Sequence, residues 1–305
     1  MRVLVTGVCG QLGHDVMNEL IARGHEATGS DIAPAYAGVK DGTAVTTAPY
    51  VQLDITDGDA VRAALRAAAP EAVIHCAAWT AVDAAEEVDK QPLVHAINAE
   101  GTRHIAESCR ELGAKMMYIS TDYVFDGQGD TPWQPDCKAY APLNVYGRTK
   151  LAGEQAVEQA LDVFFIVRIA WVFGVNGKNF IKTMLALGEK HESLRVVCDQ
   201  IGTPTYTLDL SRLLADMIVT SQYGYYHATN TGGYISWADF AEEIFRQAGM
   251  RTQVTRVTTQ EYGLSRAARP FNSRLDQSRL TQRGFEPLPH WKDALSRYLK
   301  QLDRT

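Results

Sequence analysis

A tyrosine and a lysine that could exchange a proton with a ligand stand four residues apart, at Tyr146 and Lys150. The surrounding stretch is typical of the first turns of a helix, so the phenol and the ammonium are expected on one helix face. A phenol is almost fully protonated at neutral pH, and a nearby cation lowers its pKa, which lets it pass a proton to a substrate oxygen. Because many helices carry such a pair on their solvated surface, the chemistry depends on the elements that position it.

The start of the chain carries a pattern that would bind a dinucleotide. Residues 1–6 form an apolar run typical of a buried parallel strand, and the apolar periodicity after residue 11 predicts a helix that ends near Gly24. Three glycines between them let the backbone approach a pyrophosphate at the positive end of that helix. A glycine-rich loop without a ligand is the alternative, because the commoner fingerprint has its first two glycines two apart. The residues assigned to the cofactor here are Gly7, Gly10, Gln11, Leu12 and Gly13.

Asp31 closes the next predicted strand, residues 26–31. A carboxylate at this position accepts hydrogen bonds from the adenosine ribose, and a 2′-phosphate would meet a like charge there. Asp31 therefore favours NADH over NADPH, although Arg2 and Lys40 could compensate the charge. An ordinary turn aspartate is the alternative.

Two further predicted strands, residues 50–54 and 72–76, end in residues suited to line a cofactor. The first end would meet the adenine ring, unless its carboxylate or that of Asp57 caps the following helix. The second end consists of small residues that let a cofactor lie against the backbone, followed by polar side chains that face the open cleft. The residues assigned here are Asp54, Ile55, Ala77, Ala78, Thr80 and Asp83.

Composition places the chain among ordinary soluble proteins. Its 305 residues can bury a large core, and its net charge of -6 argues against a nucleic-acid surface. The five cysteines have neither paired nor metal-binding spacing and are typical of reduced cytosolic thiols. No long apolar stretch or signal peptide is recognised, so we expect no membrane contact and a cytoplasmic location.

Alternating strands and helices predict the fold class. The pattern continues past residue 54 with helices at 57–69 and 92–112 and strands at 72–76 and 115–121. Such alternation indicates an α/β fold with a Rossmann-type, doubly wound parallel sheet. We expect a dinucleotide-binding domain at residues 1–170, with a return segment at about 199–230. A smaller C-terminal α/β substrate-binding domain would comprise residues 171–198 and 231–305.

Seven stretches then carry a resemblance to a known family. The chain resembles the extended short-chain dehydrogenase/reductases, and within them the dTDP-4-dehydrorhamnose reductase family. The stretches at residues 5–13 and 146–154 are shared by the whole superfamily. The stretches at residues 120–127, 168–174, 199–205 and 269–276 are more specific to the family. The matching stretches are residues 5–13, 77–83, 120–127, 146–154, 168–174, 199–205 and 269–276.

The resemblance implies a catalytic trio of Thr121, Tyr146 and Lys150. Thr121 would donate a hydrogen bond to the substrate carbonyl, and Tyr146 would protonate its oxygen. Lys150 would hold the nicotinamide ribose while lowering the pKa of the tyrosine. The alternative is that Thr121 only ends a strand and that Lys150 is a solvated helix residue.

Substrate residues follow from the same resemblance. Asp122 and Tyr123 would hold the sugar, and Trp171 would offer an apolar face and an indole donor unless it belongs to the core. Guanidinium groups suit a diphosphate, although surface arginines without a ligand are the alternative. The substrate assignments are Asp83, Asp122, Tyr123, Trp171, Asn179, Gln200, Arg269 and Arg274.

The resemblance implies NAD(P)H-dependent reduction of the 4-keto group of dTDP-4-dehydro-L-rhamnose to dTDP-L-rhamnose. The first alternative is a reductase of another nucleotide-linked ketosugar. The second is a non-catalytic binding subunit that resembles the regulatory subunit of methionine adenosyltransferase. The scattered histidines predict no metal site, and the acidic residues of a magnesium-assisted dimer described in some relatives are not matched, which leaves a homodimer open.

Overall fold

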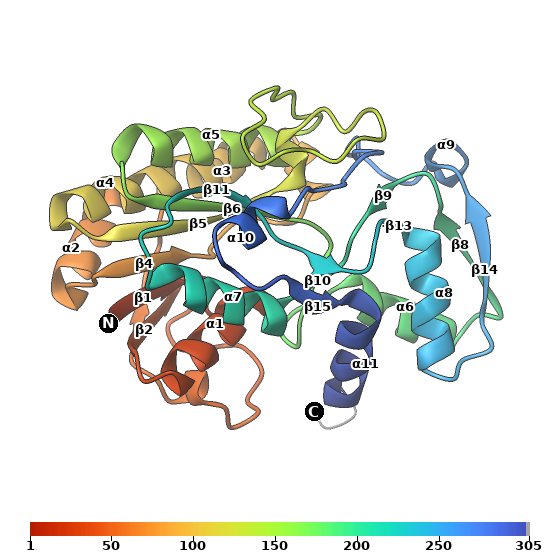
Figure 1. The fold of residues 1–305 in the computed structure, drawn as a ribbon, viewed down its shortest axis with the longest axis horizontal. Coiled ribbons are helices and arrows are strands. Elements are labelled where there is room, and N and C mark those ends of the chain that lie inside the picture. The colour runs from red at the N-terminus through yellow and green to blue at the C-terminus, as the bar shows by residue number, and fades with distance from the viewer. Residues whose placement is uncertain (303–305) are drawn as a thin grey trace.

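A parallel sheet of seven strands forms the larger part of the molecule, in a computed structural model that describes residues 1–302 (Figure 1). The strand order is β11-β6-β5-β4-β1-β2-β3, and every neighbouring pair in this sheet is parallel. This order reverses between β1 and β4, as a doubly wound sheet requires, so the predicted fold class is confirmed. The strands are β1 (Arg2–Thr6), β2 (Glu26–Asp31), β3 (Tyr50–Gln52), β4 (Ala72–His75), β5 (Lys115–Thr121), β6 (Phe164–Ile169) and β11 (Gly224–His227).

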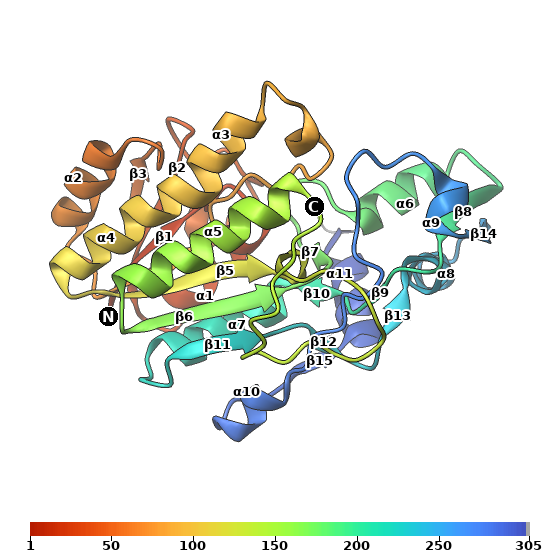
Figure 2. The ribbon, with the colours of Figure 1, turned by 90° about the horizontal axis from the view of Figure 1, so that it is seen from above.

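Helices cover both faces of this sheet, as the two perpendicular views show (Figures 1 and 2). One face packs against α1 (Gln11–Ala22) and α7 (Thr207–Ile218), and the other against α2 (Gly58–Ala68), α4 (Thr102–Leu112) and α5 (Val145–Ala160). Two apolar clusters, one on each face, account for the near-continuous hydrophobic strands.

The helix predicted at residues 92–112 contains an irregular segment. It consists of α3 (Gln91–His95), a π-helical stretch at Ala96–Gly101, and α4. Single π-helical turns insert an extra residue into an α-helix and occur often at functional sites. Sequence periodicity did not reveal this stretch.

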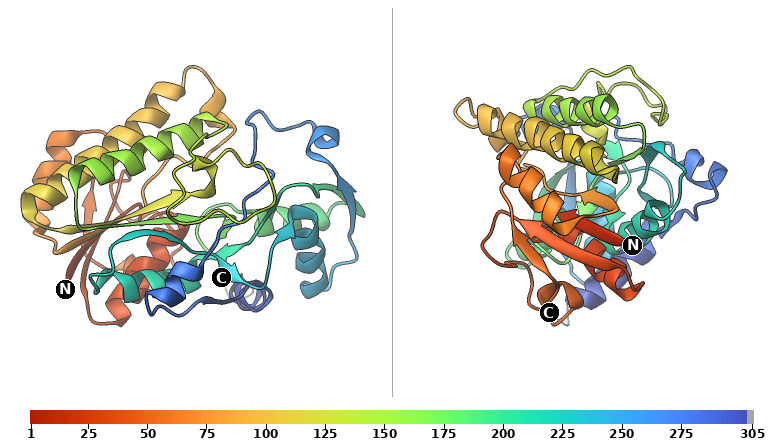
Figure 3. Two further views of the ribbon diagram at one scale, coloured as in Figure 1. Left: turned by 45° about the horizontal axis from the view of Figure 1, so that its top comes forward. Right: turned by 90° about the vertical axis from the view of Figure 1, so that its left-hand side faces the viewer.

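A second group of elements lies beyond the carboxyl ends of the strands (Figures 1 and 3). Its core is built around Phe173, Phe240 and Tyr298. Its parallel pair β8–β14 was absent from our predictions. The elements are β7 (Val172–Phe173), α6 (Phe180–Gly188), β8 (Ser193–Val197), β9 (Ile201–Gly202), β10 (Thr205–Tyr206), β12 (Asn230–Thr231), β13 (Ile235–Ser236), α8 (Trp237–Gln247), β14 (Gln253–Val257), α9 (Thr259–Tyr262), β15 (Leu288–His290) and α11 (Trp291–Leu302).

The C-terminal part of the chain contributes to both cores. Leu280 lies in the short helix α10 (Ser278–Gln282) and packs with Phe285 and Leu288 in the core of the seven-stranded sheet. All three belong to the segment 231–305 that was expected in the smaller domain, whereas α7 and β11 of the return segment join the sheet as expected. The domain division itself stays a prediction. None of the helices described in residues 1–302 is long and apolar enough to cross a membrane.

Candidate active site

A cavity of about 1050 Å³ runs along the carboxyl ends of the central strands, between the sheet and the second group of elements. In a doubly wound sheet, ligands bind where the strand order reverses, and here that point lies between β1 and β4. The volume is at the upper end of the range for a single drug-sized ligand, so it suits a dinucleotide together with a second molecule.

The glycine turn lines one end of this cavity. Gly7 has a left-handed φ of +73°, and a Cβ there would lie 2.6 Å from the backbone nitrogen of Ala77. A Cβ on Gly13 would lie 2.2 Å from the Gly7 carbonyl oxygen. Only glycine therefore lets this turn close while α1 begins directly behind it. The predicted loop residues Gly7, Gly10, Gln11, Leu12 and Gly13 all line the cavity.

Asp31 stands at the end of β2 with both carboxylate oxygens engaged. One oxygen accepts the Cys9 backbone N–H at 2.9 Å, and the other accepts that of Ile32 at 2.8 Å. Each oxygen has a second lone pair, so the carboxylate braces the turn and is still able to accept from a ligand hydroxyl.

The ends of β3 and β4 also lie where the sequence predicts. Asp54 accepts from the backbone and hydroxyl of Thr56, whereas Asp57 caps α2 through the N–H groups of Asp59 and Ala60. The N-cap alternative thus applies to Asp57 and not to Asp54. The predicted residues Asp54, Ile55, Ala77, Ala78 and Thr80 all line the cavity.

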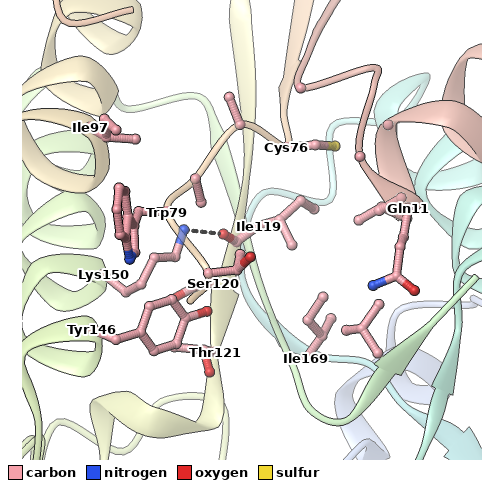
Figure 4. Close-up of a pocket in the computed structure, with 18 of the residues that line it drawn as sticks. Gln11, Cys76, Trp79, Ile97, Ile119, Ser120, Thr121, Tyr146, Lys150 and Ile169 are labelled. Carbon is pink, nitrogen blue, oxygen red and sulfur yellow. Dashed lines mark hydrogen bonds between the residues drawn. The ribbon is translucent and has the colours of Figure 1, made fainter. Parts of the chain in front are cut away.

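Thr121, Tyr146 and Lys150 meet at the end of β5, as Figure 4 shows. Asn144 caps α5 by accepting the Gly147 N–H at 2.8 Å, which starts the helix one residue before Tyr146. The 3.6-residue period then directs Tyr146 and Lys150 to the same side. The Lys150 ammonium donates to the Ile119 carbonyl at 2.7 Å.

Burial sets the proton affinities of this trio. Burial raises the pKa of Tyr146 above its ordinary value, and the Thr121 hydroxyl acts in the opposite direction. Burial lowers the pKa of Lys150 to about 7, against the opposing influence of Glu154 and Cys76. Our expectation that Lys150 lowers the pKa of Tyr146 is wrong for this arrangement, because the ammonium is directed at Ile119 instead.

Asp122 forms the floor of the cavity beside the trio. Its carboxylate accepts the Thr121 hydroxyl at 3.0 Å, and burial raises the pKa of Asp122 to about 6. Within residues 1–302, the second oxygen of Asp122 and the hydroxyl of Ser120 are buried without a hydrogen-bond partner. Tyr123 packs edge-on against Tyr146, with ring centroids 5.6 Å apart. Buried polar atoms of this kind, lining a cavity, are groups that a polar ligand would satisfy.

Asp83 and Arg269, two predicted substrate residues, pair with each other. The guanidinium donates to both carboxylate oxygens of Asp83, at 3.1 and 2.6 Å. Asp83 also accepts the backbone N–H groups of Arg266 and Ala267. Arg269 lines the cavity, whereas Asp83 stands behind it and orients it.

Besides Asp83, three predicted substrate residues lie outside the lining of the cavity, and each has a structural partner. Asn179 caps α6 and donates to Gln11, Gly174 and Tyr298. Gln200 is buried and donates to the Thr259 hydroxyl. Arg274 donates to Asn272 and lies over the Tyr234 ring. These three residues do not line the cavity, and their assignment to the substrate stays a prediction.

Aromatic side chains form the wall of the cavity that faces the sheet. Trp171 has an unusual φ of +50° and stacks on Trp237, with ring centroids 3.8 Å apart. Phe180 lies 4.6 Å from Trp237, and Lys178 lines the same wall. Strain of this kind concentrates at functional sites. Lys178, Phe180 and Trp237 were not assigned to the site, although the two aromatic residues stand at the first positions of α6 and α8 and could have been recognised.

No group of three His, Cys, Asp or Glu side chains within residues 1–302 is placed to hold a metal ion. The absence of a metal from the reaction stays a prediction. His75 is fully buried between the hydroxyls of Thr6 and Thr102, so it serves the core of the sheet.

Comparisons with known proteins agree with this geometry. A family model described as RmlD substrate binding domain matches residues 1–304. A dTDP-4-dehydrorhamnose reductase of Streptomyces griseus is 43% identical over 97% of this chain and 92% of its own length. Two solved dTDP-4-dehydrorhamnose reductases are each 38% identical. The one from Bacillus anthracis, in complex with NADP, has a TM-score of 0.86 and covers 98% of this chain and 99% of that chain. The one from Clostridium acetobutylicum has a TM-score of 0.89 and covers 99% and 100%. The chain belongs to the RmlD substrate-binding family, with dTDP-4-dehydrorhamnose reductases among its members.

Proposed function

We propose that this protein reduces the 4-keto group of dTDP-4-dehydro-L-rhamnose and forms dTDP-L-rhamnose. The observation that carries the proposal is the convergence of Thr121, Tyr146 and Lys150 in the same cavity as the glycine turn. Relatives that share about two fifths of the sequence are named for this activity.

The residues present fit a nicotinamide dinucleotide. The cradle at Gly7 and Gly13 would be filled by any Cβ, so it offers space to a pyrophosphate at the start of α1. Asp31 would hold the adenosine ribose, and Asp54 and Ile55 would contact the adenine. The cofactor would lie against the residues that follow β4, which are Ala77, Ala78 and Thr80. When bound, the reduced cofactor supplies the hydride.

The side chains of the chain itself manage the proton and the carbonyl. Tyr146, whose pKa is raised by burial, keeps its hydrogen and donates it to the ketone oxygen. Thr121 holds that oxygen by a second hydrogen bond, which requires its hydroxyl to turn away from Asp122. Lys150 contributes a cation at the base of the site and would bind the nicotinamide ribose.

The substrate would lie between the trio and the aromatic wall. Trp171 gives a flat apolar surface for the deoxysugar, and Asp122 and Tyr123 offer polar contacts beside it. Arg269, held in place by Asp83, presents its guanidinium to the diphosphate.

A spectroscopic assay tests the function. Purified protein is mixed with dTDP-4-dehydro-L-rhamnose and NADH or NADPH, and loss of absorbance from the reduced nicotinamide is followed. Turnover with only another nucleotide-linked 4-ketosugar would favour the first alternative, and binding without turnover of any of them would favour a non-catalytic subunit. Either result would overturn the proposal.

Tyr146→Phe tests the acid directly. The variant should lose at least about two orders of magnitude in kcat, the usual contribution of a general acid, while its cofactor affinity changes little. The control is Tyr262→Phe, which removes a phenol hydroxyl from α9, outside the cavity lining, and should retain the activity. A Tyr146→Phe variant with normal kcat would remove the tyrosine from this role.

Asp31 is the basis for a preference for NADH. Its carboxylate would repel a 2′-phosphate, whereas the Bacillus anthracis relative was solved with NADP. Asp31→Ala should raise kcat/KM for NADPH relative to NADH by about tenfold or more, measured with each cofactor in turn. An unchanged ratio would mean that Asp31 only braces the turn.

Two expectations concern the setting of the enzyme. A homodimer and a cytoplasmic location both remain predictions. Sedimentation of the purified protein and fractionation of its source cells would test them separately.

A further inference from the structure

Lys150 keeps its ammonium in a place without an anionic partner. The residue is 3% exposed, and its ammonium donates to the Ile119 carbonyl, as Figure 4 shows. Among residues 1–302, no carboxylate lies within ion-pair distance of it. Glu154, one helical turn along α5, is engaged by the Arg168 guanidinium at 2.8 and 2.7 Å. A buried charge needs compensation from some other source.

The ring of Tyr118 supplies the nearest electron-rich surface. The Lys150 Nζ lies 4.1 Å from the centroid of this ring, which is fully buried on β5. The Tyr118 hydroxyl donates to the Lys150 backbone carbonyl at 3.3 Å, and its ring stacks on His75 at 5.7 Å. A Cβ on Gly153 would lie 2.3 Å from the Tyr118 hydroxyl, so glycine is required where the ring passes under α5.

The other titratable groups around Lys150 are neutral near pH 7. Burial raises the pKa of Cys76 to about 12 and lowers that of His75 to about 3. Burial also raises the pKa values of Tyr146 and Tyr118. The π face of Tyr118 and the Ile119 carbonyl are therefore the groups in contact that favour the charged lysine, with Glu154 acting from a greater distance.

We infer that Tyr118 is a positioning residue, whose ring face keeps Lys150 charged and directs its ammonium toward the end of β5. A cation over an aromatic face is attracted by the ring quadrupole, and the attraction is strongest where water is excluded. Because it acts through Lys150, this role rests on the proposed reductase function. The hydroxyl of Tyr118 is secondary in this role, since the ring provides the attraction.

Fluorinated phenylalanines at position 118 provide the test, because they weaken the π face while nearly preserving its shape. Tyr118→Phe is the matched control and should keep the wild-type pH profile of kcat. Increasing fluorination should move the high-pH loss of activity to lower pH, by about one pH unit for the most fluorinated ring. Activity near pH 6 should remain within a few fold of the control. A profile independent of fluorine content would overturn the inference.

A second measurement keeps this test separate from the reaction. Direct NMR titration of ¹³C-labelled lysine, with the Lys150 signal assigned by Lys150→Arg, reports its pKa without substrate. The pKa should fall stepwise with fluorination, and a constant value would contradict the role of Tyr118 even in a protein without activity. Absence of turnover in the wild-type protein would instead contradict the proposed function and leave the titration decisive for Tyr118.

Discussion

Asp122 shows how one buried carboxyl group connects stability with pH. Its folded-state pKa of about 6 lies above the ordinary value of 3.8, because burial outweighs its hydrogen bonds. The folded protein therefore binds this proton more tightly than the unfolded chain does. The stabilising contribution is complete below about pH 4 and is lost as pH rises through about 6.

Asp122→Asn should consequently stabilise the protein at neutral pH. The expected gain in unfolding free energy is on the order of 2 to 3 kcal/mol at pH 8 and close to zero at pH 4. Thermal unfolding at several pH values measures it, with the exposed Asp162→Asn as the control that should show no such trend. An equal effect of Asp122→Asn at both pH values would contradict the assigned pKa.

At the level of single residues, sequence reasoning succeeded where a motif sets the backbone. Gly7, Tyr146 and Lys150 lie where strand, turn and helix place them. It gave less where a polar side chain can have a structural partner: Asn179, assigned to the substrate, caps α6. Trp237 was missed because its contact with Trp171 joins segments 66 positions apart, which no local pattern encodes.

The π-helical stretch Ala96–Gly101 acts as an element of the site through Asn98. This buried side chain accepts the Trp79 backbone N–H at 2.8 Å and donates to the Trp79 carbonyl at 3.2 Å. It also donates to the Thr149 hydroxyl at 3.1 Å, on the helix that carries Tyr146. Asn98 therefore ties the loop after β4 to α5.

Asn98→Ala should cost about 2 to 4 kcal/mol of stability and also lower kcat. The substitution leaves the backbone N–H and carbonyl of Trp79 without this partner. The loop after β4, which lines the cofactor side of the cavity, then loses its connection to α5. The control is Asn230→Ala, a buried asparagine bonded to Tyr206 and Asp209 in the second group of elements. It should cost similar stability with kcat retained at a temperature where both variants are folded. Equal kcat in the two variants would mean that Asn98 serves stability alone.

Whole elements were predicted well where apolar runs are bounded by turns. β2 and β5 have the predicted limits, because each is a buried strand between polar or glycine-containing segments. The pair β8–β14 was not predicted, because apolar and polar residues alternate only weakly along its strands. Both strands are also largely exposed and lie far apart in the chain. Pairing of that kind depends on tertiary contacts.

Across the whole molecule, the glycine turn is linked to the second group of elements by Gln11. Its side-chain oxygen accepts the Gly174 N–H at 2.9 Å and the Asn179 amide at 3.0 Å. Asn179 in turn donates to the Tyr298 hydroxyl on α11 at 2.8 Å. A cofactor bound at the glycine turn would therefore be connected, through the hydrogen bonds of Gln11 and Asn179, to the elements that carry the aromatic wall.

Gln11→Ala should weaken this coupling. In the wild-type protein, cofactor at about 100 times its Kd should stabilise the fold by about 2.7 kcal/mol and slow hydrogen exchange in α6. In the variant the protection of α6 should fall, while that of β1 persists. Asn18→Ala is the control, because its partners Thr43 and Val45 lie on the side away from α6. Full protection of α6 in Gln11→Ala would show that the link is not needed.

The packing of Leu280, Phe285 and Leu288 against the seven-stranded sheet also affects how the protein folds during its synthesis. β1 leaves the ribosome long before Leu280, Phe285 and Leu288, which join the same apolar cluster beside β11 and α7. Domains generally fold as units during translation, and incomplete ones expose adhesive surface. The nascent chain must therefore reach Leu288 before this core is complete, which makes it a suitable client for chaperones that hold emerging polypeptides.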